Sequence, residues 1–387
     1  MSKNPHPRRR GLIRHRVAGG ILVAALLLSA PGCAPSPGAG GSTPQAWQTM
    51  MDRWRSRAEA PAVVVGVQDG EPATWVGASG TPERNGHNAV DPSATFRIAS
   101  ITKMFVAVVT LQLVEEGRLT LDEPLSAYRP ALPYGQVTIR QLLNHTSGIP
   151  DYSQATDLGK ELLAHRDRRW TSTEVIALIK NNKPQFPPGT AYQYSNTDYV
   201  LLGEVISAVT GTNWARQVRD RILDPLHLDH TYIPGTEPVP VRVLPGCFDT
   251  DNDGDEENIE TDGTWPALET SEGPAGAMVS NATDLLTFGN ALFHHRLLQQ
   301  ESFQAMATEG PFHPRNSNYG LGLEIVRPDY QTLIWGHAGF LPGFKSVLWY
   351  VPSQDTVIVV LTNTSRANPT DLAELVLRTL PKRTPQP

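Results

Sequence analysis

A serine and a lysine lie one helical turn apart at Ser100 and Lys103, and this pair is able to perform nucleophilic catalysis. Turn residues 91–95 precede the pair and the apolar run 106–113 follows it, so we expect Ser100 at the start of a helix. The unpaired N–H groups of a helix start favour developing negative charge, and a partly desolvated lysine can accept the serine proton. Taken alone, however, the spacing favours a helix cap followed by a solvated lysine. Other residues must therefore decide between the two interpretations.

Two further segments contain residues that suit a ligand-binding cleft. Residues 189–196 place Tyr194 and Asn196 two positions apart on a loop before a helix. In an extended segment, side chains two positions apart point to the same side, so a phenol and an amide would face one cleft. Residues 335–340 lie at a predicted strand end, where two glycines allow close approach by a ligand. Taken alone, each segment is also explained by a turn whose side chains only pack.

Together, Ser-x-x-Lys, Tyr-x-Asn and His-x-Gly resemble, in their order and separation, the motifs of the serine β-lactamase and penicillin-binding family. The resemblance is to the branch of class C β-lactamases and D-alanyl-D-alanine carboxypeptidases. Residues 142–150, 275–280 and 319–322 also resemble stretches typical of that branch. The resemblance covers roughly residues 50–375, and it implies the β-lactamase/transpeptidase-like fold.

This resemblance implies a role for each motif residue. Ser100 would be the acylated nucleophile, Lys103 its partner in the proton path, and Tyr194 the base, alone or shared with Lys103. Because free tyrosine titrates near ~10, a nearby ammonium must favour the phenolate for this role at neutral pH. The backbone N–H groups of Ser100 and Phe340 would form the oxyanion hole. The implied substrate-binding residues are Asn196, His337, Ala338, Gly339 and Phe340.

Ala338 departs from the family pattern, which has threonine or serine at this position. In relatives that hydroxyl contacts the substrate carboxylate, and a hydrogen bond to a charged group contributes about 1.5–3 kcal/mol. Its absence predicts that recognition of a C-terminal D-alanine or a penicillin carboxylate is weakened by roughly ten- to a hundredfold. An esterase or amidase acting on an uncharged acyl compound is therefore a rival to a carboxypeptidase.

The apolar pattern predicts the elements that must hold these residues together. It indicates an α+β fold with an antiparallel sheet assembled from both chain ends, flanked by helices, and a mostly helical insertion at about residues 125–316. Thr171 and Glu174 form a capping box, and Ser280 is expected to cap a helix. Strands are predicted at 62–67, 74–77, 319–325, 332–335, 344–350 and 356–362, and helices at 45–58, 138–145, 175–181, 198–209, 214–222, 282–294 and 371–380.

Residues 1–33 have the features of a bacterial export signal, with basic residues before the apolar stretch 17–30. This stretch is too short to cross a bilayer comfortably. Residues 28–33 resemble a lipobox, which would place a lipid on Cys33, whereas cleavage near Ala30 would leave Cys33 unmodified. The sequence thus predicts an exported protein, either a lipoprotein on the outer face of the cell membrane or secreted, with membrane contact only through this anchor.

The remaining chain is predicted to contain a flexible linker at 34–47 and one catalytic domain at 48–380. Lys and Arg number 33 against 39 Asp and Glu, a net charge of −6 without a basic stripe, so no nucleic-acid partner is expected. No cofactor is expected either. His294 and His295 lack a third ligand at a suitable spacing, which argues against a zinc enzyme.

The acidic segment 249–260 fits the twelve-residue calcium-loop pattern, with glycine at the sixth position and glutamate at the twelfth. Its eighth position is Glu256, where an apolar residue is usual, and no convincing helix pair flanks it. A solvated surface loop is therefore favoured over a calcium site. The calcium ligands would be Asp249, Asp251, Asp253, Asp255 and Glu260.

The sequence thus predicts an exported serine hydrolase that forms an acyl-enzyme on Ser100. Its first interpretation is a D-alanyl-D-alanine carboxypeptidase that binds penicillin, and the alternative is a class C-like β-lactamase or an esterase. The expected partners are small peptide or acyl substrates, such as peptidoglycan stem peptides or β-lactams. A non-hydrolysing penicillin-binding or peptidoglycan-sensing module is the alternative from another class. The complete set of Ser100, Lys103 and Tyr194 argues against such a module.

Overall fold

The computed structural model describes residues 43–70, 74–251, 253–259, 264–310, 317–328 and 332–380. The predicted export signal 1–33, including Cys33, lies outside the described residues. Helix α1 (Pro44–Ala58) begins inside the predicted linker, so residues 44–47 are helical. The Thr43 side chain caps this helix by accepting a hydrogen bond from the N–H of Ala46, 3.2 Å away. Within the described ranges, no helix is both long and apolar enough to cross a membrane.

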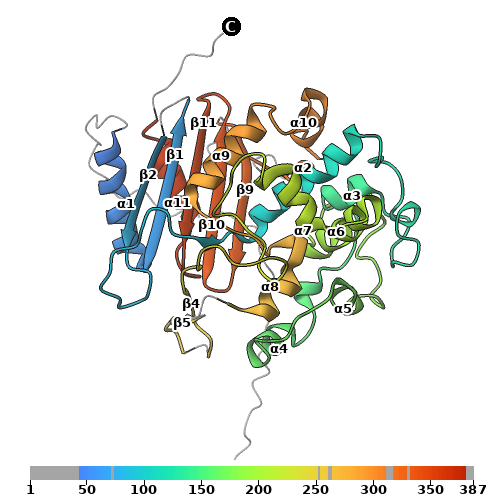
Figure 1. Ribbon diagram of the computed structural model, residues 1–387, viewed down its shortest axis with the longest axis horizontal. Coiled ribbons are helices and arrows are strands. Elements are labelled where there is room, and N and C mark those ends of the chain that lie inside the picture. The colour runs from blue at the N-terminus through green and yellow to red at the C-terminus, as the bar shows by residue number, and fades with distance from the viewer. Residues whose placement is uncertain are drawn as a thin grey trace, which may run out of the picture. The chain divides into compact units, whose positions relative to one another are not determined.

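A seven-stranded sheet in the order β2-β1-β11-β10-β9-β8-β7 forms the scaffold (Figure 1). All neighbouring strands are antiparallel, and the two chain ends meet where β1 pairs with β11, for example Val65 with Val360. The predicted sheet from both chain ends is therefore confirmed. The strands are β1 (Ala62–Asp69), β2 (Thr74–Gly80), β7 (Ser317–Tyr319), β8 (Glu324–Val326), β9 (Ile334–Leu341), β10 (Phe344–Val351) and β11 (Thr356–Thr362).

Both faces of the sheet are buried. This is clearest at β1, where apolar residues at successive positions belong to cores on opposite faces. Val63 and Val65 belong to one core with α1 and α11 (Pro369–Leu377), whereas Val64 belongs to the core on the opposite face. On that opposite face, α9 (Ala282–Phe293) lies against β1 and β11. A strand buried on both faces reads as a continuous apolar run, as this one does.

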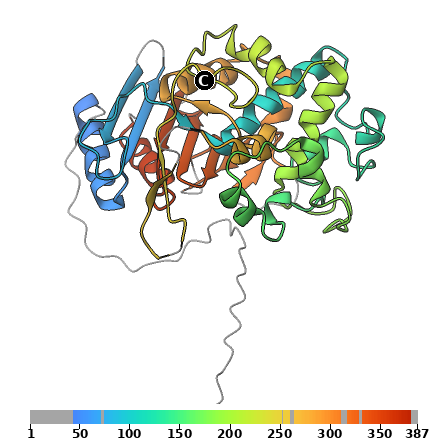
Figure 2. The same cartoon turned by 60° about the horizontal axis from the view of Figure 1, so that its bottom comes forward.

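The region between the two halves of the sheet is mostly helical, as predicted, and Figure 2 shows its helices grouped beside the sheet. Helix α2 (Thr102–Glu115) is buried along most of its length and packs against several of these helices, which is typical of a central core helix. The other elements are β3 (Phe96–Arg97), η1 (Ala99–Ile101), η2 (Leu125–Ala127), α3 (Ile139–Leu143), η3 (Tyr152–Gln154), α4 (Leu158–Ala164), α5 (Ser172–Ala177), α6 (Asn196–Thr210), α7 (Trp214–Val218), η4 (Arg219–Leu223), β4 (Gly246–Phe248), β5 (Glu257–Ile259), α8 (Pro266–Glu272), η5 (Gly273–Ala275), β6 (Val279–Ser280) and α10 (Gln300–Met306).

Three local predictions were wrong. The predicted strand 319–325 is two strands, β7 and β8, separated by a turn in which Gly322 has a φ of +79°. The predicted strand 332–335 is longer and continues to Leu341, so the His-x-Gly motif lies within β9 rather than at its end. Helix α9 is capped by Asn281, whose side chain accepts a hydrogen bond from the N–H of Asp284, while Ser280 belongs to β6.

A buried ion pair fastens β3, the strand directly before Ser100, to α8. The Arg97 guanidinium donates to Glu269 Oε1 at 2.8 Å, and both side chains are at most 6% exposed. Replacing Glu269 by alanine would leave the guanidinium in the core without this carboxylate, so we expect Glu269→Ala to lower the free energy of unfolding by about 3–5 kcal/mol. Urea unfolding measures this change. The control is Glu374→Ala, which removes a partly exposed partner of Arg378 and should cost under about 1 kcal/mol. Equal losses in both variants would contradict the assignment.

Candidate active site

The hydroxyl of Ser100 is the point on which the predicted catalytic side chains converge. Ser100 lies in the single turn η1, just before α2, as the sequence predicted. Its Oγ accepts a hydrogen bond from Tyr194 OH at 2.9 Å and lies 3.0 Å from Lys103 Nζ. The structure therefore brings a nucleophile between an amine and a phenol, although 94 residues separate the serine from the tyrosine.

The Lys103 side chain is completely buried and has three hydrogen-bond partners. Nζ contacts Ser100 Oγ at 3.0 Å and two carbonyl oxygens, Asn196 Oδ1 at 2.8 Å and Ala275 O at 2.7 Å. The carbonyl oxygens only accept, so they take two hydrogens of the amine. In the neutral state, the lone pair of Nζ is left to face the serine hydroxyl. Lys103 is thereby placed to take the proton of Ser100.

Burial lowers the pKa of Lys103 to about 8, because the ammonium loses its hydration inside the protein. Carboxyl groups around the site oppose this effect, in the order Glu272, Asp151 and Glu324, with Asp198 weaker. Burial also raises the pKa of Glu272 and of Glu324 to about 7. These carboxyls thus carry only part of their charge at neutral pH, and an appreciable fraction of Lys103 is unprotonated there.

This pKa predicts the pH dependence of acylation. A base must be unprotonated, so kcat/KM for an uncharged substrate should rise with pH as Lys103 loses its proton and level off above about 8. The measurement is a pH profile of kcat/KM between pH 5.5 and 9.5. A rising limb centred on the ordinary lysine pKa near ~10.4, or a flat profile, would contradict this assignment.

The expectation that the ammonium would lower the pKa of Tyr194 is not met. Burial raises the pKa of Tyr194 well above 10, and its hydrogen bond to Ser100 offsets this only in part. Lys103 Nζ lies 4.8 Å from the centre of the tyrosine ring. Tyr194 therefore keeps its proton in the resting site, which suits a general acid that protonates a leaving group and assigns the base to Lys103.

His145 holds Tyr194 in place, consistent with a structural role for this histidine. Its ring lies 4.2 Å from the Tyr194 ring, centre to centre. Its backbone oxygen accepts from the N–H of Gln193, and its Nδ1 accepts from the N–H of Ser195 at 3.3 Å. These bonds hold residues 193–195 extended up to the start of α6. Tyr194 and Asn196 consequently face the same side, as the spacing predicted.

The predicted motif residues 337–340 lie on β9 directly beside η1. A side chain at Gly339 would come within 2.4 Å of Ile98 O and 3.0 Å of Ala99 Cβ, so only glycine allows this contact. Burial lowers the pKa of His337 to about 3, so its ring is neutral. Its Nδ1 donates to the backbone oxygen of Ala338 at 2.5 Å, which leaves Nε2 to accept from Tyr319 OH at 2.9 Å.

Sequence reasoning missed four residues that surround the site. Glu324 on β8 accepts a hydrogen bond from the N–H of Ala338 at 3.1 Å. Asp151 accepts from the Asn196 amide at 3.2 Å, and burial raises its pKa. Tyr319 belongs to the recognised stretch 319–322 but was not assigned to the site. The missed residues are Asp151, Glu272, Tyr319 and Glu324.

The acidic loop has a different arrangement from the one that the calcium pattern implies. Ligand oxygens of Asp249, Asp251 and Asp253 lie within 4.8 Å of one another and of Glu257, whereas Asp255 is not in this cluster and Glu260 lies outside the described residues. Three of the four residues in the cluster are exposed, and the preference for a solvated loop over a calcium site stays a prediction. The unusual Glu256 is buried and ion-paired with Arg84 at 3.0 Å, which explains an acidic residue at that position.

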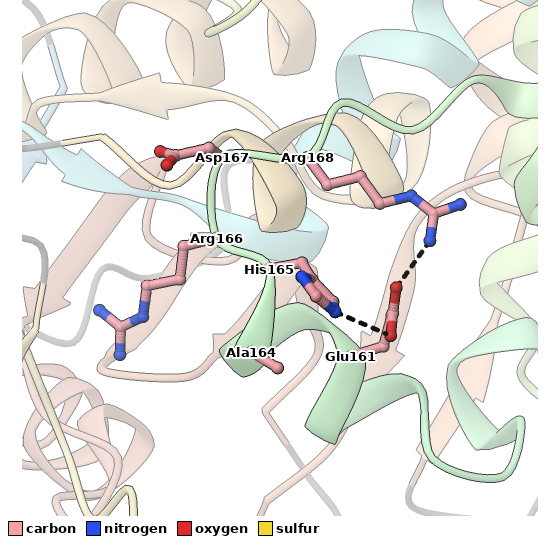
Figure 3. Close-up of a pocket in the computed structure, with 6 residues that line it drawn as sticks. All are labelled: Glu161, Ala164, His165, Arg166, Asp167 and Arg168. Carbon is pink, nitrogen blue, oxygen red and sulfur yellow. Dashed lines mark hydrogen bonds and ion pairs between the residues drawn. The ribbon is translucent and has the colours of Figure 1, made fainter.

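A separate surface hollow lies at the end of α4, lined by Glu161 and residues 164–168 (Figure 3). Three of its side chains pair with one another, since Glu161 contacts both His165 and Arg168. The lining contains no residue of the Ser100 cluster. We therefore place the candidate active site at Ser100 and not at this hollow.

Comparison with known proteins gives consistent results. The family model described as Beta-lactamase matches residues 47–380. Penicillin-binding protein 4 of Amycolatopsis lactamdurans is 28% identical over 341 residues, covering 82% of this chain and 84% of that protein. A D-stereospecific amidohydrolase from Streptomyces sp. has a structure with a TM-score of 0.76 and 31% identity, covering 86% of this chain and 98% of that one. A D-amino acid amidase from Ochrobactrum anthropi SV3, in complex with L-phenylalanine, has a structure with a TM-score of 0.77 and 28% identity. The match covers 87% of this chain and 97% of that one.

Proposed function

The chain belongs to the beta-lactamase family of serine hydrolases, and on this premise we propose that it hydrolyses an amide bond beside a D-configured residue in a small substrate. The observation that carries this proposal is the convergence of Lys103 Nζ and Tyr194 OH on Ser100 Oγ within 3.0 Å. A module that only binds a ligand has no need for a buried amine with a lowered pKa beside a serine. The D-configuration is supported by the names of the amidohydrolase and the amidase described above.

The arrangement supports a two-step reaction. Lys103 Nζ takes the proton of Ser100 as Oγ attacks the substrate carbonyl, and the N–H groups of Ser100 and Phe340 hold the oxyanion. The Tyr194 hydroxyl gives its proton to the leaving nitrogen as the C–N bond breaks, and the Lys103 ammonium then reprotonates the phenolate. Water then attacks the carbonyl of the acyl-enzyme while Lys103 Nζ takes its proton. Lys103 returns this proton to Ser100 Oγ as the carboxylic acid is released.

An amidase is a better fit to this site than a carboxypeptidase. A carboxypeptidase must receive a free carboxylate, but Ala338 offers no hydroxyl to it and Glu324 places a second carboxyl beside the same backbone N–H. The carboxypeptidase is the second candidate, and its support is that relatives named penicillin-binding proteins match most of the chain.

The test is turnover of a matched panel: D- and L-phenylalanine amide, N-acetyl-D-alanyl-D-alanine, a penicillin and p-nitrophenyl acetate. The proposal predicts hydrolysis of the D-amide at least tenfold faster than the L-amide. Faster hydrolysis of the L-amide would overturn the stereochemical part. Cleavage of the free dipeptide but of neither amide would instead establish the carboxypeptidase. No hydrolysis of any compound, with no acylated Ser100, would overturn the whole proposal.

We also propose that the protein is exported and tethered through a lipid on Cys33. The support is the basic and apolar pattern of residues 1–33 followed by a linker rich in small residues. The mature protein from bacterial membranes should begin at Cys33 and carry an added diacylglyceryl mass. A mature chain that begins upstream of Cys33, or carries no lipid, would overturn the tether.

A further inference from the structure

Strand β9 presents an open edge beside the nucleophile. Its first residues pair with β8, from Ile334 to Gly336, whereas among the described residues 337–341 pair only with β10 on the other side. In an antiparallel strand, the N–H and C=O groups of every second residue point to the same side. The N–H of Ala338 points to the open side, since it donates to Glu324 there. The N–H of Phe340 therefore also points to the open side.

The spacing of the N–H groups along this edge sets the distance between Glu324 and the substrate carbonyl that Ser100 attacks. Gly339 packs on Ala99, the residue before Ser100, and the next residue, Phe340, supplies the second N–H of the proposed oxyanion hole. Two residues of a strand span about 7 Å, so a carbonyl held at the N–H of Phe340 lies about that far from the N–H of Ala338. Glu324 Oε2 occupies this second N–H at 3.1 Å. A substrate that extends along the edge must bring its next polar group to this carboxyl.

Among the residues that the structure describes, few positive charges lie near the Glu324 carboxyl at the open edge. Its other oxygen, Oε1, lies 3.5 Å from His337 Nδ1, but His337 is neutral and donates to a backbone oxygen. Burial raises the pKa of Glu324 to about 7, while the hydrogen bond from the N–H of Ala338 and the charge of Lys103 lower it in part. Lys345 lies over the Phe340 ring, 5.7 Å from its centre, and interacts with the carboxyls of Glu256 and Asp371. The Glu324 side chain keeps 29% of its surface exposed, so a ligand can reach it.

We propose that Glu324 determines specificity by charge: it disfavours substrates that place a carboxylate beside Ala338 and favours those that place an uncharged carboxamide there. This inference rests on the proposed function and names its substrate class. Two like charges about 4–7 Å apart at an effective dielectric near 20 repel strongly enough for a preference on the order of tenfold or more. The carboxamide can also donate a hydrogen bond to Glu324, which a carboxylate cannot.

The experiment compares N-acetyl-D-alanyl-D-alanine with its C-terminal carboxamide and measures the release of D-alanine or D-alaninamide. The same bond is then cleaved in both compounds, which share the acyl group and differ in one charge. We expect wild-type kcat/KM at pH 8.5 to favour the carboxamide at least tenfold. Glu324→Gln keeps an oxygen for the Ala338 N–H and removes the charge, so it should bring the ratio to within about threefold of one. Asp52→Asn removes an exposed charge on α1, which packs at the opposite end of the sheet, and should leave the wild-type ratio unchanged.

Each outcome decides the inference. A ratio taken on one preparation does not depend on the folded fraction, so partial unfolding of Glu324→Gln does not disturb it. A wild-type ratio of one or below overturns the inference even if the variant is inactive. An unchanged ratio in an active Glu324→Gln also overturns it. If neither dipeptide is hydrolysed but D-phenylalanine amide is, the inference fails and the proposed function stands. If D-phenylalanine amide is not hydrolysed either and Ser100 is not acylated, the proposed function fails and the inference fails with it.

Discussion

Replacing Ser100 by alanine is expected to lower kcat/KM for the best amide substrate by a factor on the order of 10⁴–10⁶. The reason is that Oγ is the atom on which Lys103 and Tyr194 converge, and the acyl-enzyme cannot form without it. The buried lysine keeps its bonds to Asn196 Oδ1 and Ala275 O in this variant. The free energy of unfolding should thus change by less than about 1 kcal/mol.

Ser56→Ala is the matched control for this loss, because Ser56 is an exposed serine on α1. It should retain wild-type kinetics. Residual activity above about 1% in purified Ser100→Ala would show that another group carries the reaction. If the melting temperature falls so far that the variant unfolds under assay conditions, unfolding and not the missing Oγ would explain the lost activity. The melting temperature and kcat/KM are therefore measured together.

Replacing Lys103 by methionine is expected to lower kcat/KM by about 10²–10⁴, the usual contribution of a general base. Methionine fills the buried channel but cannot accept the serine proton. The prediction has a second part that a loss of packing would not produce: the rising limb near pH 8 should disappear from the pH profile. Slow acylation of Ser100 should still be detectable.

Lys160→Met is the control, because the Lys160 side chain is 85% exposed on α4. It should leave both the rate and the pH profile unchanged. If Lys103→Met keeps a rising limb near pH 8, another group is the base. Tyr194 would then be the first to test, with Tyr194→Phe.

The three motifs could be predicted because each depends on local geometry. Ser100 and Lys103 share a face because they are three residues apart at a helix start, and Tyr194 and Asn196 share a side because they are two apart in an extended segment. The protonation state of Tyr194 could not be predicted in the same way. It depends on burial against His145 and Tyr319, which come from other parts of the chain.

The carboxyls around the site gave no sequence signal. Glu324 reaches Ala338 only because the segment predicted as one strand breaks at Gly322, which sets the register of β8 against β9. Asp151 and Glu272 reach Lys103 from a loop and a helix end that are 121 residues apart, since 272 − 151 = 121. The sequence showed that Ala338 replaces the usual threonine or serine. It did not show that Glu324 accepts the hydrogen bond of the Ala338 N–H.

The central claim is that Ser100 becomes acylated, and intact-protein mass spectrometry after incubation with a D-amino acid amide, a penicillin and p-nitrophenyl acetate tests it most directly. With at least one of these compounds, the protein should gain the mass of one acyl group, and peptide mapping should place it on Ser100. The Ser100→Ala variant should gain none. An acyl group on another residue, or turnover with no adduct in the rapidly quenched wild-type protein, would contradict it.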